Sequence, residues 1–133
     1  MTVGKIDTKS GAFKPIKVAG QNGLAAQAHG LTRDPNGILW FNINPGKGGL
    51  ARLDPKTEKI QVYIPPQGMS PTGGATTVDY DGKGFVWASS PIGALRFDPR
   101  EEKFTEFKSV TYKTQNGTGV TYGLAADRDG NGY

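Results

Sequence analysis

The stretch GLTRDPNGILWF (residues 30–41) recurs in altered form as ATTVDYDGKGFVWA (residues 75–88), and this repetition decides the fold. Three positions of the two stretches match, the last after a two-residue insertion: Asp34 with Asp79, Gly37 with Gly82, and Trp40 with Trp87. Repetition at a fixed period is the sequence signature of a repeat architecture, in which each unit is one supersecondary motif.

The match continues downstream, where GGLARLDPKTEKIQVY (residues 48–63) lies over IGALRFDPREEKFTEF (residues 92–107). Equivalent residues here are 44 positions apart (Arg52 and Arg96, Asp54 and Asp98, Pro55 and Pro99), compared with 45 for Asp34 and Asp79. A third copy begins at residues 123–133, with Asp127 and Gly130 matching Asp79 and Gly82 at an offset of 48. A fourth copy is represented by its later part, GKIDTKSGAF (residues 4–13). The chain therefore holds two whole repeats and two partial ones.

Each repeat is predicted to form four short strands, which in the first whole repeat cover residues 30–34, 38–43, 50–53 and 60–64. The intervening DPNG, NPGKGG and DPKTE segments have strong turn chemistry. A helix is the alternative after Asp98, because DPRE resembles a capping box and Phe104 and Phe107 have helical spacing. The matching KIQVYI (residues 59–64) alternates like a strand, so we interpret Asp-Pro in both repeats as the opening of a type I turn.

A period near 45 residues with four strands per unit is typical of a β-propeller blade. We therefore predict an all-β fold, an incomplete β-propeller of about three four-stranded blades. Its expected parts are the end of one blade with an inter-blade loop (residues 1–29), two whole repeats (residues 30–74 and 75–122) and the start of the next blade (residues 123–133). A closed propeller needs at least about four blades. We expect the open blade edges to be covered by the remaining blades of a longer parent chain or by self-association.

Composition excludes several classes of function. The 133 residues include 20 glycines, 9 prolines and no cysteine, which rules out disulfides, thiolate metal sites and cysteine nucleophiles. The formal charge of +4 comes from scattered lysines, without the basic runs that bind nucleic acid. No apolar run is long enough for a transmembrane helix, and MTVGKIDTKSGAFK lacks the apolar centre of a signal peptide. We expect neither a nucleic-acid partner nor a membrane.

The phrases GLTRDPNGILWF, GLARLDPKTEKIQVYIPP and GLAADRDGNGY resemble the blade repeat of the virginiamycin B lyase family of streptogramin lyases. That resemblance implies a propeller of about seven blades, with a C–O lyase site and a bound magnesium ion in the funnel at one end of the central channel. The family opens a cyclic depsipeptide by elimination at an ester and uses histidine and glutamate. Relatives of this kind are often exported, but no residue of this chain decides the compartment.

The resemblance has one departure that bears on activity. Many family repeats have Trp-Phe-Thr-Glu in the second strand, whereas this chain has WFNI (residues 40–43) and WASS (residues 87–90). Neither whole blade keeps the carboxylate. We therefore expect this segment alone to be inactive as a lyase and to hold no cofactor, with magnesium confined to the parent propeller.

Candidate site residues lie in the loops that reach the funnel of a propeller. His29, the only histidine, ends the inter-blade loop VAGQNGLAAQAH and is the candidate catalytic base or hydrogen-bond donor. Its repeat partners are Gly74 and Tyr122, so a turn or packing role is the alternative. The groups expected to face a small-molecule or peptide-like ligand are Asn44, Lys47, Ser70, Ser90 and Tyr122.

Two other motifs are interpreted as structural. DRDGNG (residues 127–132) fits only the first half of a calcium-binding loop and matches the other hairpin turns, so we expect Asp127 to accept backbone hydrogen bonds. Arg52 and Arg96 recur with the blade. Two functional classes stay open: an enzyme segment of a streptogramin-lyase-like propeller, and a non-catalytic propeller that binds a ligand or protein.

Overall fold

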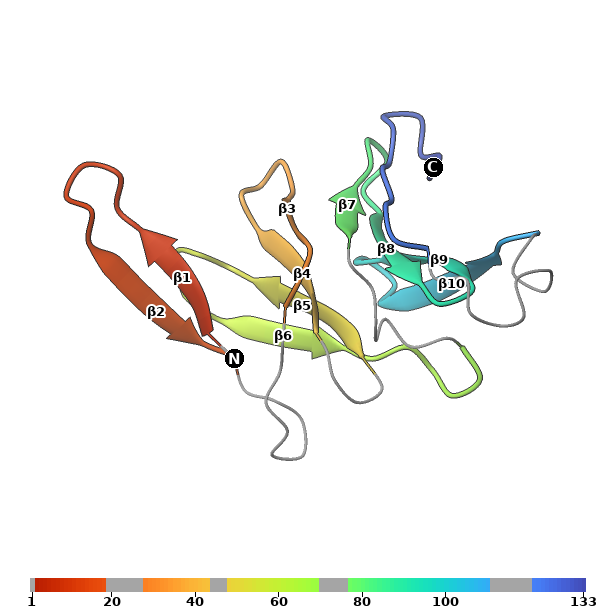
Figure 1. Cartoon of the computed structure of the whole chain (residues 1–133), viewed down its shortest axis with the longest axis horizontal. Coiled ribbons are helices and arrows are strands. Elements are labelled where there is room, and N and C mark those ends of the chain that lie inside the picture. The colour runs from red at the N-terminus through yellow and green to blue at the C-terminus, as the bar shows by residue number, and fades with distance from the viewer. Residues whose placement is uncertain (1, 19–27, 44–47, 70–76, 111–120) are drawn as a thin grey trace.

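The computed structural model describes residues 2–18, 28–43, 48–69, 77–110 and 121–133. These residues form three antiparallel sheets and, within the described ranges, no helix, and hence none able to span a membrane (Figure 1). The ten strands are β1 (Thr2–Ile6), β2 (Phe13–Lys17), β3 (Leu31–Arg33), β4 (Leu39–Ile43), β5 (Gly49–Leu53), β6 (Ile60–Tyr63), β7 (Val78–Tyr80), β8 (Val86–Ser90), β9 (Gly93–Asp98) and β10 (Lys103–Lys108). The all-β prediction is confirmed.

Two of the sheets are four-stranded meanders, in the orders β3-β4-β5-β6 and β7-β8-β9-β10, and the third is the β1-β2 hairpin. The four strands predicted in the first whole repeat agree with β3 to β6 within one residue at every end. The helix considered after Asp98 does not form, because residues 103–108 pair with β9 in register, with Phe104 opposite Phe97. Sequence alternation therefore outweighed the helical capping signal.

The first hairpin of each four-stranded sheet is closed by an aspartate whose carboxylate accepts three hydrogen bonds, an arrangement we call the Asp clasp. Asp34 Oδ1 accepts from the backbone N–H groups of Asn36 (2.9 Å) and Ile38 (3.0 Å). Its Oδ2 accepts from the indole Nε1 of Trp40 at 3.2 Å. Gly37, within the turn, has φ +84°, a conformation that glycine adopts without strain. The clasp thus holds the β3–β4 turn, the start of β4 and the Trp40 side chain in a fixed arrangement.

The second clasp corrects the alignment made from the sequence. Asp81, not Asp79, accepts from the N–H groups two and four residues ahead and from Trp87 Nε1, the last at 2.8 Å. The glycine with positive φ is Gly84, not Gly82. Equivalent residues in this hairpin are therefore 47 positions apart (34 to 81, 40 to 87), and the motif D-x-x-G-x-x-W contains no insertion.

The insertion instead lies between the second and third strands. Five residues (44–48) separate β4 from β5, whereas two (91–92) separate β8 from β9. The three extra residues account for the change in offset from 47 to 44 between the first and second halves of the repeat. DYDG offers two aspartates at similar distance from a glycine, and only the hydrogen bonds distinguish them.

A third clasp ends the described chain. Asp127 accepts from the backbone N–H groups of Asp129 and Asn131, each at 2.9 Å, and from the Tyr133 hydroxyl at 3.0 Å. Tyr133 therefore occupies the tryptophan position, rather than that of Phe85 as the alignment implied. The equivalent residues are Asp81 and Asp127, at an offset of 46. The expectation that Asp127 accepts backbone hydrogen bonds is confirmed.

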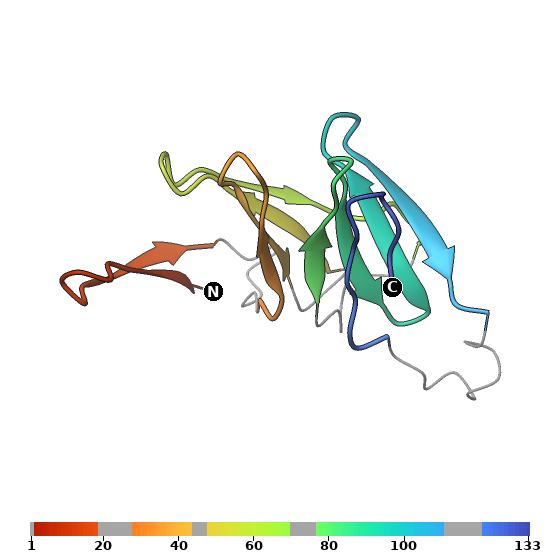
Figure 2. The ribbon, with the colours of Figure 1, turned by 90° about the horizontal axis from the view of Figure 1, so that it is seen from above.

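The core consists of two layers between sheets. One cluster lies between the two four-stranded sheets and is centred on the fully buried Phe97, whose ring is 5.9 Å from that of Trp40 and 4.6 Å from that of Tyr63. The other joins Ile16 and Val18 to the opposite face of β4 and β5. The first strands β3 and β7 lie side by side where the sheets approach most closely (Figure 2). Each sheet is therefore packed face to face on its neighbour, as blades are.

Candidate functional site

His29 lies at the start of β3, where a buried asparagine holds the backbone. Asn42, in β4, is fully buried, and its Oδ1 accepts hydrogen bonds from the N–H groups of Gly30 (2.7 Å) and His29 (3.2 Å). Because antiparallel β3 and β4 place residues 29–30 beside residue 42, a short polar side chain at that point reaches the incoming backbone. The His29 side chain itself is exposed. Asn42 thus holds the backbone from which the exposed His29 imidazole projects.

The next sheet is built the same way with a smaller residue. Ser89, equivalent to Asn42, accepts from the N–H of Thr77 at 3.4 Å through its Oγ, and its own N–H donates to the Thr77 carbonyl at 3.2 Å. The residue equivalent to His29 is accordingly position 76 and not Gly74, both of which lie outside the described residues. The Thr77 hydroxyl then donates to the backbone carbonyl of Tyr122 at 3.0 Å. These bonds link the starts of successive repeats.

The result is an aromatic pair at one end of the sheets. The ring centroids of His29 and Tyr122 are 6.4 Å apart and their planes meet at 77°, an edge-to-face arrangement. Tyr122 is 68% exposed. Both residues were predicted to face the funnel, but their direct contact was not predicted. The repeat could have indicated this contact. The structural offsets of 47 and 46 residues relate position 29 to position 76 and position 76 to position 122, so His29 and Tyr122 are equivalent residues of their repeats.

Of the other predicted ligand-facing residues, the structure describes Ser90, which does not face the surface. Ser90 is fully buried at the end of β8, and its Oγ has no hydrogen-bond partner among the described residues. By strand alternation it shares the face of Val86 and Ala88, which packs on the neighbouring sheet. It lies beneath the surface and not on it. Asn44, Lys47 and Ser70 lie outside the described residues.

The described residues do not provide a magnesium site. Magnesium prefers several oxygen ligands, usually including carboxylates. Within the described ranges, no group of three or more His, Asp or Glu side chains comes together in a way that could hold a metal. Beside His29, the Asn42 oxygen already accepts two backbone hydrogen bonds. No chemical step through the metal follows from this set of residues.

The fold of this chain is similar to that of two solved structures. The chain superposes on a catalytically inactive variant of virginiamycin B lyase from Staphylococcus aureus, crystallised with quinupristin, with a TM-score of 0.66 and 23% sequence identity. It also superposes on the extracellular domain of a putative one-component system from B. thetaiotaomicron, with a TM-score of 0.57 and 18% identity.

The fold is a partial β-propeller. The superpositions cover 83% and 80% of this chain, but only 35% and 13% of the two solved chains. No protein-family model and no curated protein matches the sequence. At these identities the likeness extends to the fold, and the residues at the His29 end have to be judged on their own chemistry.

Proposed function

We propose that this chain is the part of a β-propeller that binds a small-molecule or peptide-like ligand at the end of the sheets where His29 and Tyr122 meet. The observation that carries the proposal is their edge-to-face contact at 6.4 Å. Exposed aromatic side chains held by a rigid sheet supply contact area at little conformational cost. His29 adds ring nitrogens that donate and accept hydrogen bonds.

The positioning of this pair supports binding by a preformed surface. His29 is anchored through Asn42, and Tyr122 through its carbonyl to Thr77, so the backbones of both residues are fixed by side chains of neighbouring strands. A ligand meeting the pair would lose little binding free energy to ordering the protein.

A C–O lyase acting on a cyclic depsipeptide ester is the second candidate. It is favoured by the likeness to virginiamycin B lyase together with an exposed histidine at the expected end of the sheets. In that reaction His29 would remove a proton on the alcohol side of the ester, from the carbon next to the one that carries the ester oxygen. The bond between that oxygen and its alkyl carbon would then break, which leaves a carboxylate and an alkene. The described residues supply one candidate base and no carboxylate cluster. The binding role therefore accounts for more of the geometry.

Quinupristin, the compound bound in the solved lyase, is the first probe. We expect isothermal titration calorimetry to detect binding by the 133-residue chain, and His29→Ala and Tyr122→Ala each to weaken it by roughly tenfold. Arg33→Ala, an exposed residue farther along β3, is the matched control and leaves binding unchanged. Equal affinity in all four proteins would overturn the site.

Liquid chromatography with tandem mass spectrometry of the same mixtures, with magnesium added, separates the two functions, because the ring-opened product of an elimination is an isomer of the substrate with the same mass. Binding without any ring-opened product supports the binding role. Ring-opened product that disappears in His29→Ala would replace the binding role with the lyase.

A further inference from the structure

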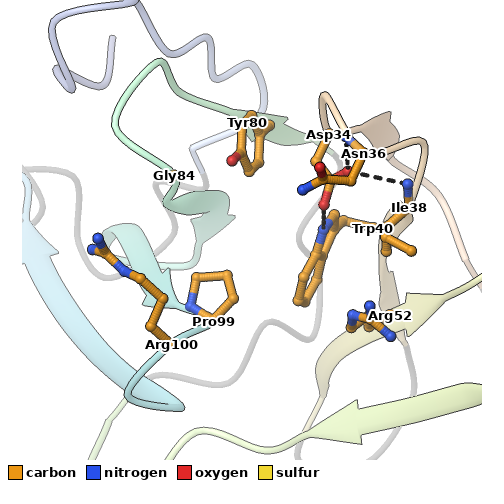
Figure 3. A pocket seen from close by; sticks show the side chains of 9 residues that line it. All are labelled: Asp34, Asn36, Ile38, Trp40, Arg52, Tyr80, Gly84, Pro99 and Arg100. Carbon is orange, nitrogen blue, oxygen red and sulfur yellow. Dashed lines mark hydrogen bonds between the residues drawn. The ribbon is translucent and has the colours of Figure 1, made fainter.

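A cleft lies at the opposite end of the strands from His29 and Tyr122. It separates the two four-stranded sheets beside their Asp clasps and has a volume of about 500 Å³, within the usual range for small-molecule sites. Its principal lining residues are Asn36, Ile38, Trp40, Arg52, Tyr80 and Pro99 (Figure 3). Neither the sequence patterns nor the proposed function uses this cleft.

Two walls of the cleft are apolar and face each other. Ile38 and the edge of the buried Trp40 come from the first sheet, and Pro99 comes from the β9–β10 turn of the second (Figure 3). The Trp40 indole cannot turn to offer its N–H to a ligand, because Asp34 accepts that hydrogen. The space between the walls therefore suits a flat apolar group.

Arg52 supplies a positive charge at the edge of this space. No carboxylate of the described residues lies within 4 Å of its guanidinium. Its Nη1 donates a long hydrogen bond, 3.4 Å, to Gln61 Oε1. Arg100, across the cleft, differs because its Nε and Nη2 donate to Asp98 at 3.0 and 3.1 Å. Arg52 is thus the cation of the cleft without a carboxylate within 4 Å, although its charge contributes to lowering the pKa of Asp54.

The equivalent arginine in the next sheet shows what a structural role would look like. Arg96 lies opposite Trp87 as Arg52 lies opposite Trp40. Its guanidinium is 4.4 Å from the Phe85 ring centre and within 6 Å of those of Trp87 and Phe107. At the position of Phe85 the first sheet has Ile38, and Arg52 makes no such ring contact among the described residues. Packing on aromatic rings therefore explains Arg96 and leaves Arg52 unexplained.

Neutral donors complete the lining. The Tyr80 hydroxyl faces the cleft and makes no hydrogen bond within the described residues (Figure 3). Burial, followed by the nearby Asp34 and Asp81 carboxylates, raises the pKa of Tyr80, so its proton is available to an acceptor at neutral pH. Asp34 also lines the cleft, and its carboxylate accepts hydrogen bonds from three N–H donors while its charge still acts on Tyr80. The exposed amide of Asn36 offers a further donor.

We propose that this cleft binds a small organic anion with a flat apolar body, an aryl carboxylate. The ring lies between Trp40, Ile38 and Pro99, and the carboxylate accepts hydrogen bonds from Arg52. Guanidinium geometry matches a carboxylate bidentately, which makes arginine the usual residue for this recognition. Tyr80 donates to a remaining lone pair of one of the two carboxylate oxygens.

Benzoate tests the proposal, with benzamide as its neutral counterpart of the same shape. Titration is followed by the indole ¹H–¹⁵N resonances of the uniformly ¹⁵N-labelled chain. Trp40 lines the cleft, whereas Trp87, clasped in the same way by Asp81, lies outside it and acts as an internal control. We expect benzoate to shift the Trp40 resonance saturably, to leave Trp87 in place, and to bind at least tenfold more tightly than benzamide.

Arg52→Gln is expected to weaken benzoate binding tenfold to hundredfold, roughly the loss of one charge-assisted bond. Tyr80→Phe, which removes only the hydroxyl, is expected to weaken it severalfold, and Arg33→Gln is the matched charge control. An unchanged Trp87 indole resonance, which comes from outside the cleft, confirms that each variant is folded. Equal binding of benzoate and benzamide, equal shifts of both indoles, or undiminished binding by Arg52→Gln would each overturn the proposal.

Discussion

The Tyr133 hydroxyl donates to Asp127 Oδ2 at 3.0 Å, in the place where Trp87 Nε1 donates to Asp81 Oδ2. A phenol therefore substitutes for an indole in the same clasp. The two residues differ in exposure, since Trp87 is buried and Tyr133 is 77% exposed. The clasp forms in both settings, which shows that its geometry depends on the local sequence more than on burial.

The hydrogen bonds of this third clasp lower the pKa of Asp127 from 3.8 to about 2. The Asn131 side chain is the largest cause, and Tyr133 contributes less. We expect Asn131→Ala to raise the pKa of Asp127 toward 3.8, and Tyr133→Phe to raise it by a smaller amount. A ¹³C titration of the side-chain carboxyl measures both, and a larger rise in Tyr133→Phe would reverse the order of causes.

The same shift predicts the direction of acid sensitivity. A carboxyl whose pKa is lower in the folded chain stabilises the fold above its unfolded value near 4, and this contribution is lost as the pH falls through about 2. The pKa values of Asp7, Asp54 and Asp98 are also lowered, chiefly by hydrogen bonds to backbone or side-chain donors. We expect the urea midpoint to decrease steadily from pH 5 to pH 2. A midpoint that rises over this range would contradict the assignment.

Removing a buried clasp should be costly. Asp81 is 1% exposed, and Asp81→Ala leaves the Trp87 indole and two backbone N–H groups without their acceptor. We expect the free energy of unfolding to fall by about 2–4 kcal/mol, measured by urea denaturation. Asp129→Ala, in the turn of the exposed third clasp, is the control and should change it by less than about 0.5 kcal/mol. Similar losses in the two variants would contradict a specific role for the carboxylate.

Two glutamates occupy a backbone conformation that favours glycine. Glu58 and Glu102 end the β5–β6 and β9–β10 turns with φ of 58° and 51°. The matching β1–β2 turn has Gly11 at this position, with φ 72°. We expect Glu102→Gly to stabilise the chain by about 0.5–1 kcal/mol, because glycine adopts this region without steric cost. Glu101→Gly, one residue earlier and without positive φ, should not stabilise it. Thermal unfolding of the two variants makes the comparison.

The backbone anchor of His29 is also testable. Asn42→Ala removes the acceptor for two N–H groups and is expected to cost about 1–3 kcal/mol. Asn42→Ser introduces the residue that Ser89 already provides in the next sheet, and we expect it to recover part of the loss. Chemical denaturation gives the stabilities, and hydrogen exchange at the Gly30 amide reports the anchor directly. Protection of Gly30 that persists in Asn42→Ala would refute the role of this side chain.

The sequence predicted the fold because each blade repeats its own turn chemistry. D-x-x-G and D-P mark turns through local hydrogen bonds and backbone conformation, so strands and their order follow from short windows. The alignment of Asp34 failed because Asp79 and Asp81 are equally plausible in sequence, and only the bond to Trp87 separates them.

The candidate sites were harder to predict. The His29–Tyr122 contact depends on how adjacent repeats pack. The cleft beside Arg52 lies where the first repeat has Ile38, whereas the next repeat has Phe85 at that position and Arg96 lies over its ring. Both the ring contact and the cleft involve residues of two repeats, so neither can be predicted from the sequence of one repeat alone.

The Asp clasp has a consequence for how such a chain can change over time. All of its bonds fall within seven consecutive residues, so a copied unit carries its own means of closing the hairpin. Because the hydrogen bonds that close the hairpin lie at the carboxylate end of each unit, they are unaffected by substitutions at the other end, such as asparagine for serine or histidine for tyrosine. New recognition chemistry can therefore arise one repeat at a time.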